Sequence, residues 1–214
     1  MTAATVQPAA DQPQLPAREA VYRDDGPLAL GLGRVARGAP ALALLLAGTV
    51  GLLVVIAVAG GDASDGVAAA GVAWVILLNG ASSESWPRQS FHWAVPPLVR
   101  LGEYAAIVWI GAVADAPEGA FALLAALTFR HYDLVYRLRH RAEVPPRWLN
   151  LLAAGWEGRL IIAWVLLAAG ALPEGMFIWA GLLAVVSVTE TVVAWRHFGR
   201  SRRPAEYDDV EDED

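Results

Sequence analysis

The chain has 214 residues, of which 56% are hydrophobic, and its mean hydropathy of +0.42 is typical of an integral membrane protein. It contains no cysteine and no Lys, which excludes disulfides, thiolate catalysis, zinc–thiolate sites and Schiff-base chemistry. The net charge of −6 comes from the C-terminal run EYDDVEDED, which holds seven carboxylates.

The two ends of the chain are predicted to be disordered. The first 27 residues are rich in Pro, Ala and Gln and show no apolar periodicity, and residues 200–214 carry the acidic run. The first long apolar run begins only near Ala41, too late for a signal peptide. We therefore expect a membrane domain over residues 28–199, with residues 1–27 and 200–214 as tails.

Six apolar segments between the tails approach the roughly 20 residues that a helix needs to cross a bilayer. In chain order they are Leu42–Gly60, Val67–Gly80, Pro97–Ala114, Gly119–Leu138, Gly155–Gly170 and Met176–Trp195. The aromatic and proline-rich stretch SSESWPRQSFHWAVPP, between the second and the third, predicts an interfacial or re-entrant segment. The expected fold is all-α, a polytopic bundle of six transmembrane helices.

The loop charges agree with six alternating spans. One side of the membrane would carry five carboxylates and no Arg: Asp62, Asp65, Asp115, Glu118 and Glu174. The other side would hold all 16 Arg residues, so the positive-inside rule predicts that both termini are cytoplasmic. The use of Arg alone, with abundant Ala, Gly and Val, is typical of a GC-rich genome such as an actinobacterial one, and we expect a bacterial plasma membrane protein.

Polar side chains gather at the inner ends of the predicted spans, where charged groups are functional candidates. Arg130, Asp133 and Arg137 share one helix face, and Asp133 can pair with Arg137 at i,i+4. Arg100 and Glu103 can likewise pair at i,i+3. The cluster is compatible with two interpretations: structural ion pairs between helices, or a polar pocket that opens to the cytoplasm.

A pocket of this composition would suit phosphate chemistry, because Arg binds phosphate oxygens and carboxylates hold Mg²⁺. The candidate phosphate-binding residues are Arg100, Arg130, Arg137 and Arg159. The candidate ligands of a Mg²⁺ cofactor are Glu103, Asp133 and Glu157. The candidate catalytic residues, including a general base, are Asp133, His131 and Glu157.

Two family resemblances bear on this pocket. The topology resembles the CDP-alcohol phosphotransferase family, whose motif is D-G-x2-A-R-x8-G-x3-D-x3-D. In NGASSESWPRQSFHWAVPPLVRLGEY, Asn79-Gly80 matches the position of Asp-Gly, and Glu103 lies near the last Asp. Ser83-Glu84 replaces Ala-Arg and Val99 replaces an Asp, so the motif is not intact.

The stretches SWPRQSFHWAVPPLVRLGEY, TFRHYDLVYRLRH and GWEGRLIIAWV resemble, over roughly residues 30–200, an uncharacterised actinobacterial membrane domain that is often fused to CDP-alcohol phosphotransferase domains. This resemblance implies a neighbourhood in phospholipid or lipid-glycan assembly.

Three functions remain open from the sequence. The first is an enzyme that transfers a phosphorylated lipid or a nucleotide-activated alcohol, and the second is a non-catalytic membrane partner of a lipid-synthesis enzyme. The third, a small transporter, is disfavoured because the charges crowd one edge and not the midplane. The expected partners are anionic lipid headgroups, a phosphorylated lipid, and a second copy of the chain or a CDP-alcohol phosphotransferase. Nucleic acid is not expected.

Overall fold

The computed structural model describes residues 21–85, 91–140 and 153–201, and within these ranges every regular element is a helix. The predicted all-α class is therefore confirmed. The helices are α2 (Pro27–Val35), α3 (Ala41–Ala59), α4 (Asp65–Ala81), α5 (Val95–Val113), α6 (Pro117–His140), α8 (Gly155–Ala168) and α9 (Leu172–Ser201), with 3-10 turns η1 (Gly60–Asp62) and η3 (His92–Ala94).

Local sequence signals explain where these helices begin and end. The Ser64 hydroxyl accepts a hydrogen bond from the Val67 backbone amide and caps α4. Pro117 opens α6, where its missing amide hydrogen has no cost. Gly60 and Gly170 adopt positive φ just after α3 and α8, as residues that end helices commonly do. The six longer helices coincide closely with the six apolar segments expected from the sequence.

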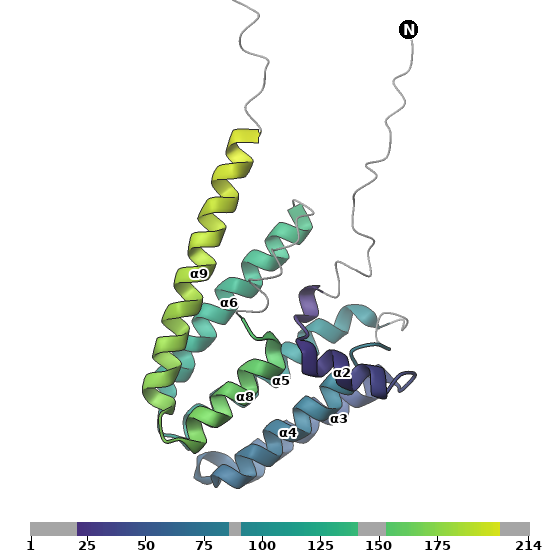
Figure 1. Ribbon diagram of the computed structural model, residues 1–214. Helices are drawn as coiled ribbons and strands as arrows, with labels where there is room; N and C mark the ends of the chain where they lie inside the picture. The colour runs from purple at the N-terminus through teal and green to yellow at the C-terminus, as the bar shows by residue number, and fades with distance from the viewer. Residues whose placement is uncertain (1–20, 86–90, 141–152, 202–214) are drawn as a thin grey trace, which may run out of the picture.

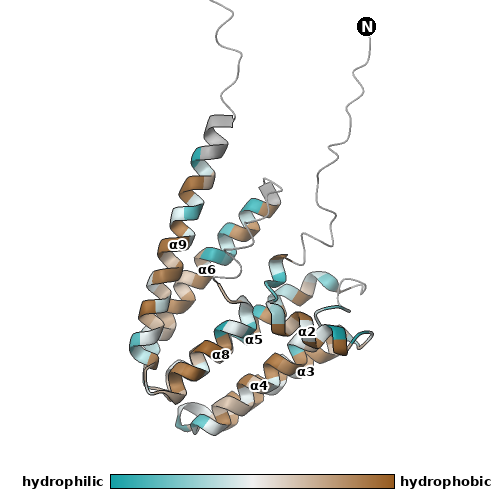
Figure 2. Cartoon of the chain, viewed as in Figure 1, coloured by the Kyte–Doolittle hydropathy of each residue, from teal (hydrophilic) through white to brown (hydrophobic). Residues whose placement is uncertain are grey.

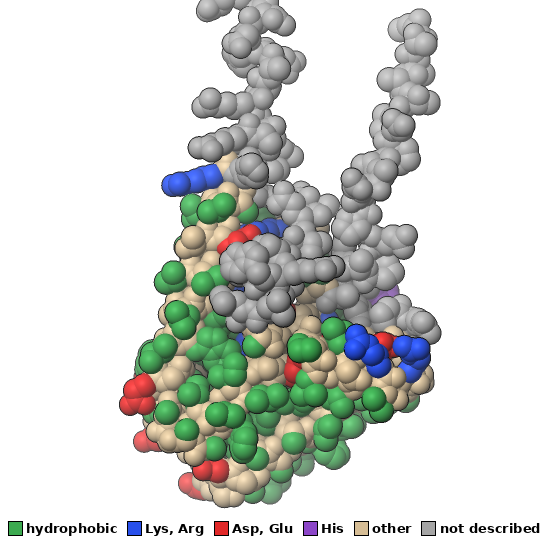
Figure 3. Space-filling model, viewed as in Figure 1, with side chains coloured by type: hydrophobic (Ala, Val, Ile, Leu, Met, Phe, Trp, Pro, Cys, Tyr) green, Lys and Arg blue, Asp and Glu red, His purple; other side chains and the backbone are tan. Residues whose placement is uncertain are grey.

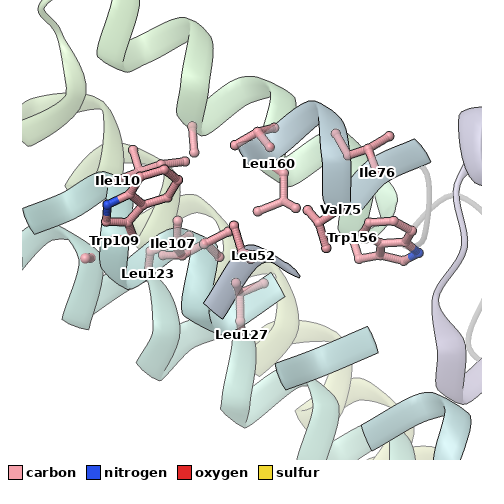
Figure 4. Close-up of a cluster of buried hydrophobic side chains, with 14 of the residues drawn as sticks. Leu52, Val75, Ile76, Ile107, Trp109, Ile110, Leu123, Leu127, Trp156 and Leu160 are labelled. Carbon is pink, nitrogen blue, oxygen red and sulfur yellow. The ribbon is translucent and has the colours of Figure 1, made fainter. Parts of the chain in front are cut away.

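The helices form three antiparallel hairpins, α3–α4, α5–α6 and α8–α9, with α2 packed across α4 and α8 (Figure 1). α5 lies in the middle and contacts α3, α4, α6 and α8. Long α6 and α9 pack along each other and extend beyond the rest (Figure 1). Buried apolar side chains from all seven of these helices meet in one core, which includes Leu52, Val75, Ile107, Leu127 and Leu160 (Figure 4).

Small residues let several helices approach closely, as is common between helices in membranes. A Cβ added to Gly71 of α4 would lie 2.7 Å from the buried Trp109 ring of α5. A Cβ on Gly80 would lie 2.8 Å from Leu32 of α2. At Gly111 of α5 it would lie 2.5 Å from the Cβ of Ala120 on α6. These contacts leave no room for side chains, so glycine sets the helix spacing.

Charge is divided between the two ends of the bundle. The three acidic turns lie at one end, where Trp109 Nε1 donates to the carbonyl oxygen of Gly60 at 2.8 Å and Gly119 packs against Pro173. Acidic side chains gather there in the space-filling view (Figure 3). Arg34 and Arg37 pair with Glu84, which follows the C-terminal end of α4, whereas Asp65 begins that helix. Among the described residues, the acidic turns are therefore separated along α4 from the Arg34 and Arg37 pairs with Glu84.

The helices differ in length and hydropathy, the two properties that decide whether a helix can cross a membrane. Two are long and apolar enough by length and composition, Ala41–Asp62 and Leu172–Arg196, and α4 is apolar but shorter. At about 1.5 Å per residue, α8 reaches only about 21 Å against a hydrocarbon core of about 30 Å. α5 carries Arg100 and Glu103 in its first half, and the second half of α6 carries several charged residues, which appear as a hydrophilic stretch on that helix (Figure 2). The structure thus supports two candidate spans and does not confirm six.

A test of the glycine contacts compares Gly111→Ala with Gly181→Ala. The first places a methyl group against Ala120, and we expect overpacking to lower the free energy of unfolding by about 1–3 kcal/mol. The second, also within a helix, meets nothing within 4 Å and serves as the control. Unfolding in detergent, followed by tryptophan fluorescence, measures both. Equal stability of the two variants would contradict the close approach of α5 and α6.

Candidate functional site

The residues before α2 lie inside the bundle. Arg23 is fully buried and Asp24 is 6% exposed, although the sequence places both in the N-terminal tail. The tail prediction therefore fails for residues 21–26, because these residues form ion pairs and hydrogen bonds with four helices, α4, α5, α6 and α8. Residues 1–20 lie outside the described ranges, as do residues 202–214 of the acidic tail.

The centre of the site is the guanidinium of Arg159 on α8, which is fully buried. Its Nε donates to Glu103 Oε1 on α5 at 2.5 Å, and its Nη1 donates to Asp24 Oδ2 at 2.9 Å. Nη1 also donates to the carbonyl oxygen of Ala153 at 3.0 Å. One cation therefore joins the N-terminal segment, α5 and the start of α8.

Three further cationic or potentially cationic groups surround the Asp24 carboxylate. Arg130 Nη2 lies 3.7 Å from Oδ1, and Arg100 Nη2 and His131 Nε2 lie 3.9 and 3.8 Å from Oδ2. Arg100 also pairs with Glu103 at 2.6 Å, which confirms the predicted i,i+3 contact. The structure thus brings together five predicted site residues: Arg100, Glu103, Arg130, His131 and Arg159.

Asp24 itself is held in an unusual state. Its backbone has a φ of 55°, a left-handed conformation that Asp tolerates better than most residues. Burial raises the pKa of its carboxyl, but Arg159, His131, Arg100 and Arg130 together hold that pKa well below its usual range. Asp24 is therefore a buried anion that the surrounding cations keep ionised.

Neighbouring contacts anchor the same segment. Arg23 pairs with Asp25 at 2.7 Å and donates to the carbonyl oxygen of Asn79. Trp156 Nε1 donates to Asp25 Oδ1 at 2.7 Å, and the Trp156 amide donates to the carbonyl oxygen of Asp24 at 3.2 Å. Arg100 Nη2 donates to the carbonyl oxygens of Tyr22 and Arg23, each at 3.0 Å. The segment is thus bound through both backbone and side chains.

Glu157, for which catalytic and metal-binding roles were predicted, contacts backbone amides at the start of α2. Its two carboxylate oxygens accept hydrogen bonds from the backbone amides of Gly26 at 3.0 Å and Ala29 at 3.2 Å. These amides belong to the first turn of α2, whose own N-cap provides no side-chain bond. Because an anion is favoured at a helix N-terminus, Glu157 acts as a cap supplied by another helix.

Asp133 and Arg137 form a second cluster with α9. Arg137 Nε lies 2.7 Å from Asp133 Oδ2, which confirms the predicted i,i+4 pair. The same guanidinium binds both oxygens of Glu190, at 2.7 and 2.5 Å, and donates to Thr191 Oγ1 at 3.2 Å. The shared face predicted for Arg130, Asp133 and Arg137 is therefore divided: Arg130 pairs with Asp24, and Arg137 joins α6 to α9.

The three predicted metal ligands therefore do not meet. Glu103 pairs with Arg100 and Arg159, Asp133 pairs with Arg137, and Glu157 caps α2. Across residues 21–85, 91–140 and 153–201, no group of three or more His, Asp or Glu side chains could hold a metal ion. The arrangement does not fit the predicted Mg²⁺ site.

Sequence reasoning missed Asp24, which the cations surround. The composition of the first 20 residues concealed it, since VYRDDG continues a Pro- and Ala-rich stretch. Gly26-Pro27 was the available signal, because Pro is favoured at the first position of a helix and an Asp pair just before it suits a helix start.

The role of Arg159 can be tested by Arg159→Met. Removing one partner from a buried ion pair leaves buried charges uncompensated, and we expect a loss of about 3–5 kcal/mol in the free energy of unfolding. Arg34→Met is the control, because its side chain is 65% exposed and pairs loosely with Glu84, and should change stability by less than about 1 kcal/mol. Unfolding in mixed micelles measures both, and comparable losses would refute the central role of Arg159.

Comparison with known proteins adds one finding. No match was found among curated proteins or among solved structures. A family model described as a family of unknown function, DUF5941, matches residues 17–213, which includes every element of the site. The chain belongs to the DUF5941 family.

Proposed function

We propose that this protein is a non-catalytic component of a bacterial plasma membrane that docks beside a lipid-synthesis enzyme. The observation that carries the proposal is that each of the candidate catalytic carboxylates already has a structural partner. Glu103, Asp133 and Glu157 are each occupied by a separate structural partner, so none of them is positioned with another for general acid–base or metal-assisted chemistry.

The same contacts supply what a rigid membrane component needs. Arg159 joins the N-terminal segment to α5 and α8, and Arg137 joins α6 to α9. Buried charged pairs are poor evidence for stability, but they favour one arrangement of helices over others by penalising unpaired alternatives. The polar residues therefore support a scaffold with a defined shape.

The partner is inferred from resemblance. The sequence is similar to a membrane domain that is often fused to CDP-alcohol phosphotransferase domains, and a domain that is fused in some proteins can dock as a separate chain in others. The transfer reaction is the alternative function. It is less well supported, because it would need carboxylates other than those separated here.

We also propose that all six long helices cross the membrane, with both termini in the cytoplasm. The division of acidic turns and Arg residues between opposite ends supports this topology. The charged ends of α5, α6 and α8 would not meet hydrocarbon, because Arg159, Glu103 and Arg130 are buried against the N-terminal segment. Because α8 is too short to span the hydrocarbon core alone, α2 and the N-terminal segment would fill the remaining thickness at its cytoplasmic end.

Cysteine labelling tests the topology cleanly, because the chain has no native cysteine. Six spans predict that Asp62→Cys and Asp115→Cys react with an impermeant maleimide from outside the cell. They also predict that Arg37→Cys and Phe91→Cys react only after the membrane is opened. Phe91, 55% exposed, is decisive: if only α3 and α9 cross, it lies on the same side as Asp62 and Asp115 and is labelled with them.

Two matched substitutions distinguish the scaffold role from a catalytic role. Asp133→Asn and Glu190→Gln each remove one partner of Arg137, and we expect similar losses of about 1.5–3 kcal/mol in the free energy of unfolding. We expect the yield of a co-expressed CDP-alcohol phosphotransferase, purified through a tag on this chain, to fall in proportion.

A catalytic Asp133 would give a different result: Asp133→Asn would abolish turnover of the phosphorylated lipid while stability and yield stayed unchanged. Failure of the wild-type chain to form any complex with the co-expressed enzyme would refute the docking proposal.

A further inference from the structure

A cavity of about 310 Å³ lies directly beside the cations that surround Asp24. Arg100 and His131 form its polar part, together with Tyr22 of the N-terminal segment. Its remaining wall is apolar and is built from η3 and the first turns of α5 on one side and from α6 on the other, including Trp93, Leu134 and Val135. Its size is at the lower end of the range for small-molecule sites.

We propose that this cavity binds the phosphate group of an amphipathic phosphorylated molecule, and that Asp24 is an internal anion that competes for the same cations. This inference is independent of the scaffold role, since a structural component and an enzyme could both hold such a ligand.

The spacing of the polar groups around the Asp24 carboxylate supports a larger anion than a carboxylate. Of Arg100, Arg130, His131 and Arg159, the last is the one whose measured distance to that carboxylate is a hydrogen bond, at 2.9 Å. Arg100, Arg130 and His131 stand 3.7–3.9 Å from its oxygens, beyond that distance. A tetrahedral phosphate has more oxygens and a greater width than a carboxylate, so it could accept hydrogen bonds from several of these groups at once.

Unused donors point the same way. Arg159 does not line the cavity but binds Asp24 beside it, and its buried Nη2 has no hydrogen-bond partner among the residues that the structure describes. His131 Nε2 is buried and also lacks a hydrogen-bond partner in that part of the chain, while its Nδ1 is held 2.6 Å from the Tyr104 hydroxyl. Buried polar atoms without partners are costly, and an anion that accepted from Arg159 Nη2, and from His131 Nε2 in the tautomer that carries its proton there, would relieve that cost.

The apolar wall selects among phosphates. A free phosphate needs only cations, whereas the side chains of Trp93, Leu134 and Val135 offer contact to a hydrocarbon portion next to the anionic group. Trp93 is 68% exposed at the cavity, in the aromatic segment predicted to lie at the membrane interface. A phosphorylated lipid that enters from the bilayer would place its phosphate near Arg100 and its hydrocarbon portion against the apolar wall.

The test uses the full chain in detergent and isothermal titration calorimetry with three probes: dihexanoyl phosphatidic acid, dihexanoyl phosphatidylcholine and inorganic phosphate. We expect phosphatidic acid to bind more tightly than the other two. Asp24→Asn should tighten its binding about tenfold, because the substitution removes the competing charge, whereas Asp25→Asn makes the same charge change on a carboxylate paired with Arg23 and should leave affinity unchanged.

A second pair of variants keeps the test decisive if Asp24→Asn does not fold. Arg100→Gln removes a cation of the cavity and should weaken phosphatidic acid binding about tenfold, while Arg34→Gln at the exposed surface should not. Equal affinities across Arg100→Gln, Arg34→Gln and wild type would overturn the proposed site. Binding of inorganic phosphate as tight as that of phosphatidic acid, with the same dependence on Arg100, would retain the anion site and overturn its assignment to a lipid.

Discussion

The contact on which this structure depends is the guanidinium of Arg159 held between the carboxylates of Glu103 and Asp24. It connects segments that are far apart in the chain: the residues before α2, the middle helix α5 and the start of α8. Each of the three groups would be strongly destabilising if buried alone, and together they compensate one another. The position of the N-terminal segment, and through it α2, therefore depends on charges inside the bundle.

This arrangement explains how an apolar chain can carry so many charged residues at the ends of its helices. Arg23, Glu103 and Arg159 are fully buried, so they are separated from lipid by protein. Glu157 stabilises the first turn of α2, and α2 in turn covers α4 and α8. The cover and the charges beneath it are mutually dependent, because α2 is capped by a residue from the helix that it shields.

The contacts also indicate which polar residues fix the helices and which are suited to bind a ligand. Among the described residues, the polar cluster expected from the sequence divides into two, since Arg137 bridges α6 to α9 while Arg100, Arg130 and Arg159 converge on Asp24. Carboxylates engaged in this way are suited to fixing helices, and the wide ring of cations beside an apolar cavity is suited to an anion. The scaffold role and the proposed phosphate site follow from different parts of the same network.

The apolar runs of the sequence by themselves determined the helices, because hydrophobic stretches bounded by Gly, Pro and Ser leave few alternatives. The local ion pairs were also readable, since Arg100–Glu103 and Asp133–Arg137 lie three and four residues apart on helices. Which residues meet across helices was not readable: Glu190 lies 53 positions from Arg137, Glu103 and Asp24 lie 56 and 135 positions from Arg159, and Gly26 lies 131 positions from Glu157. Only the tertiary structure placed Asp24 among the cations, because helix packing and not local spacing selects such partners.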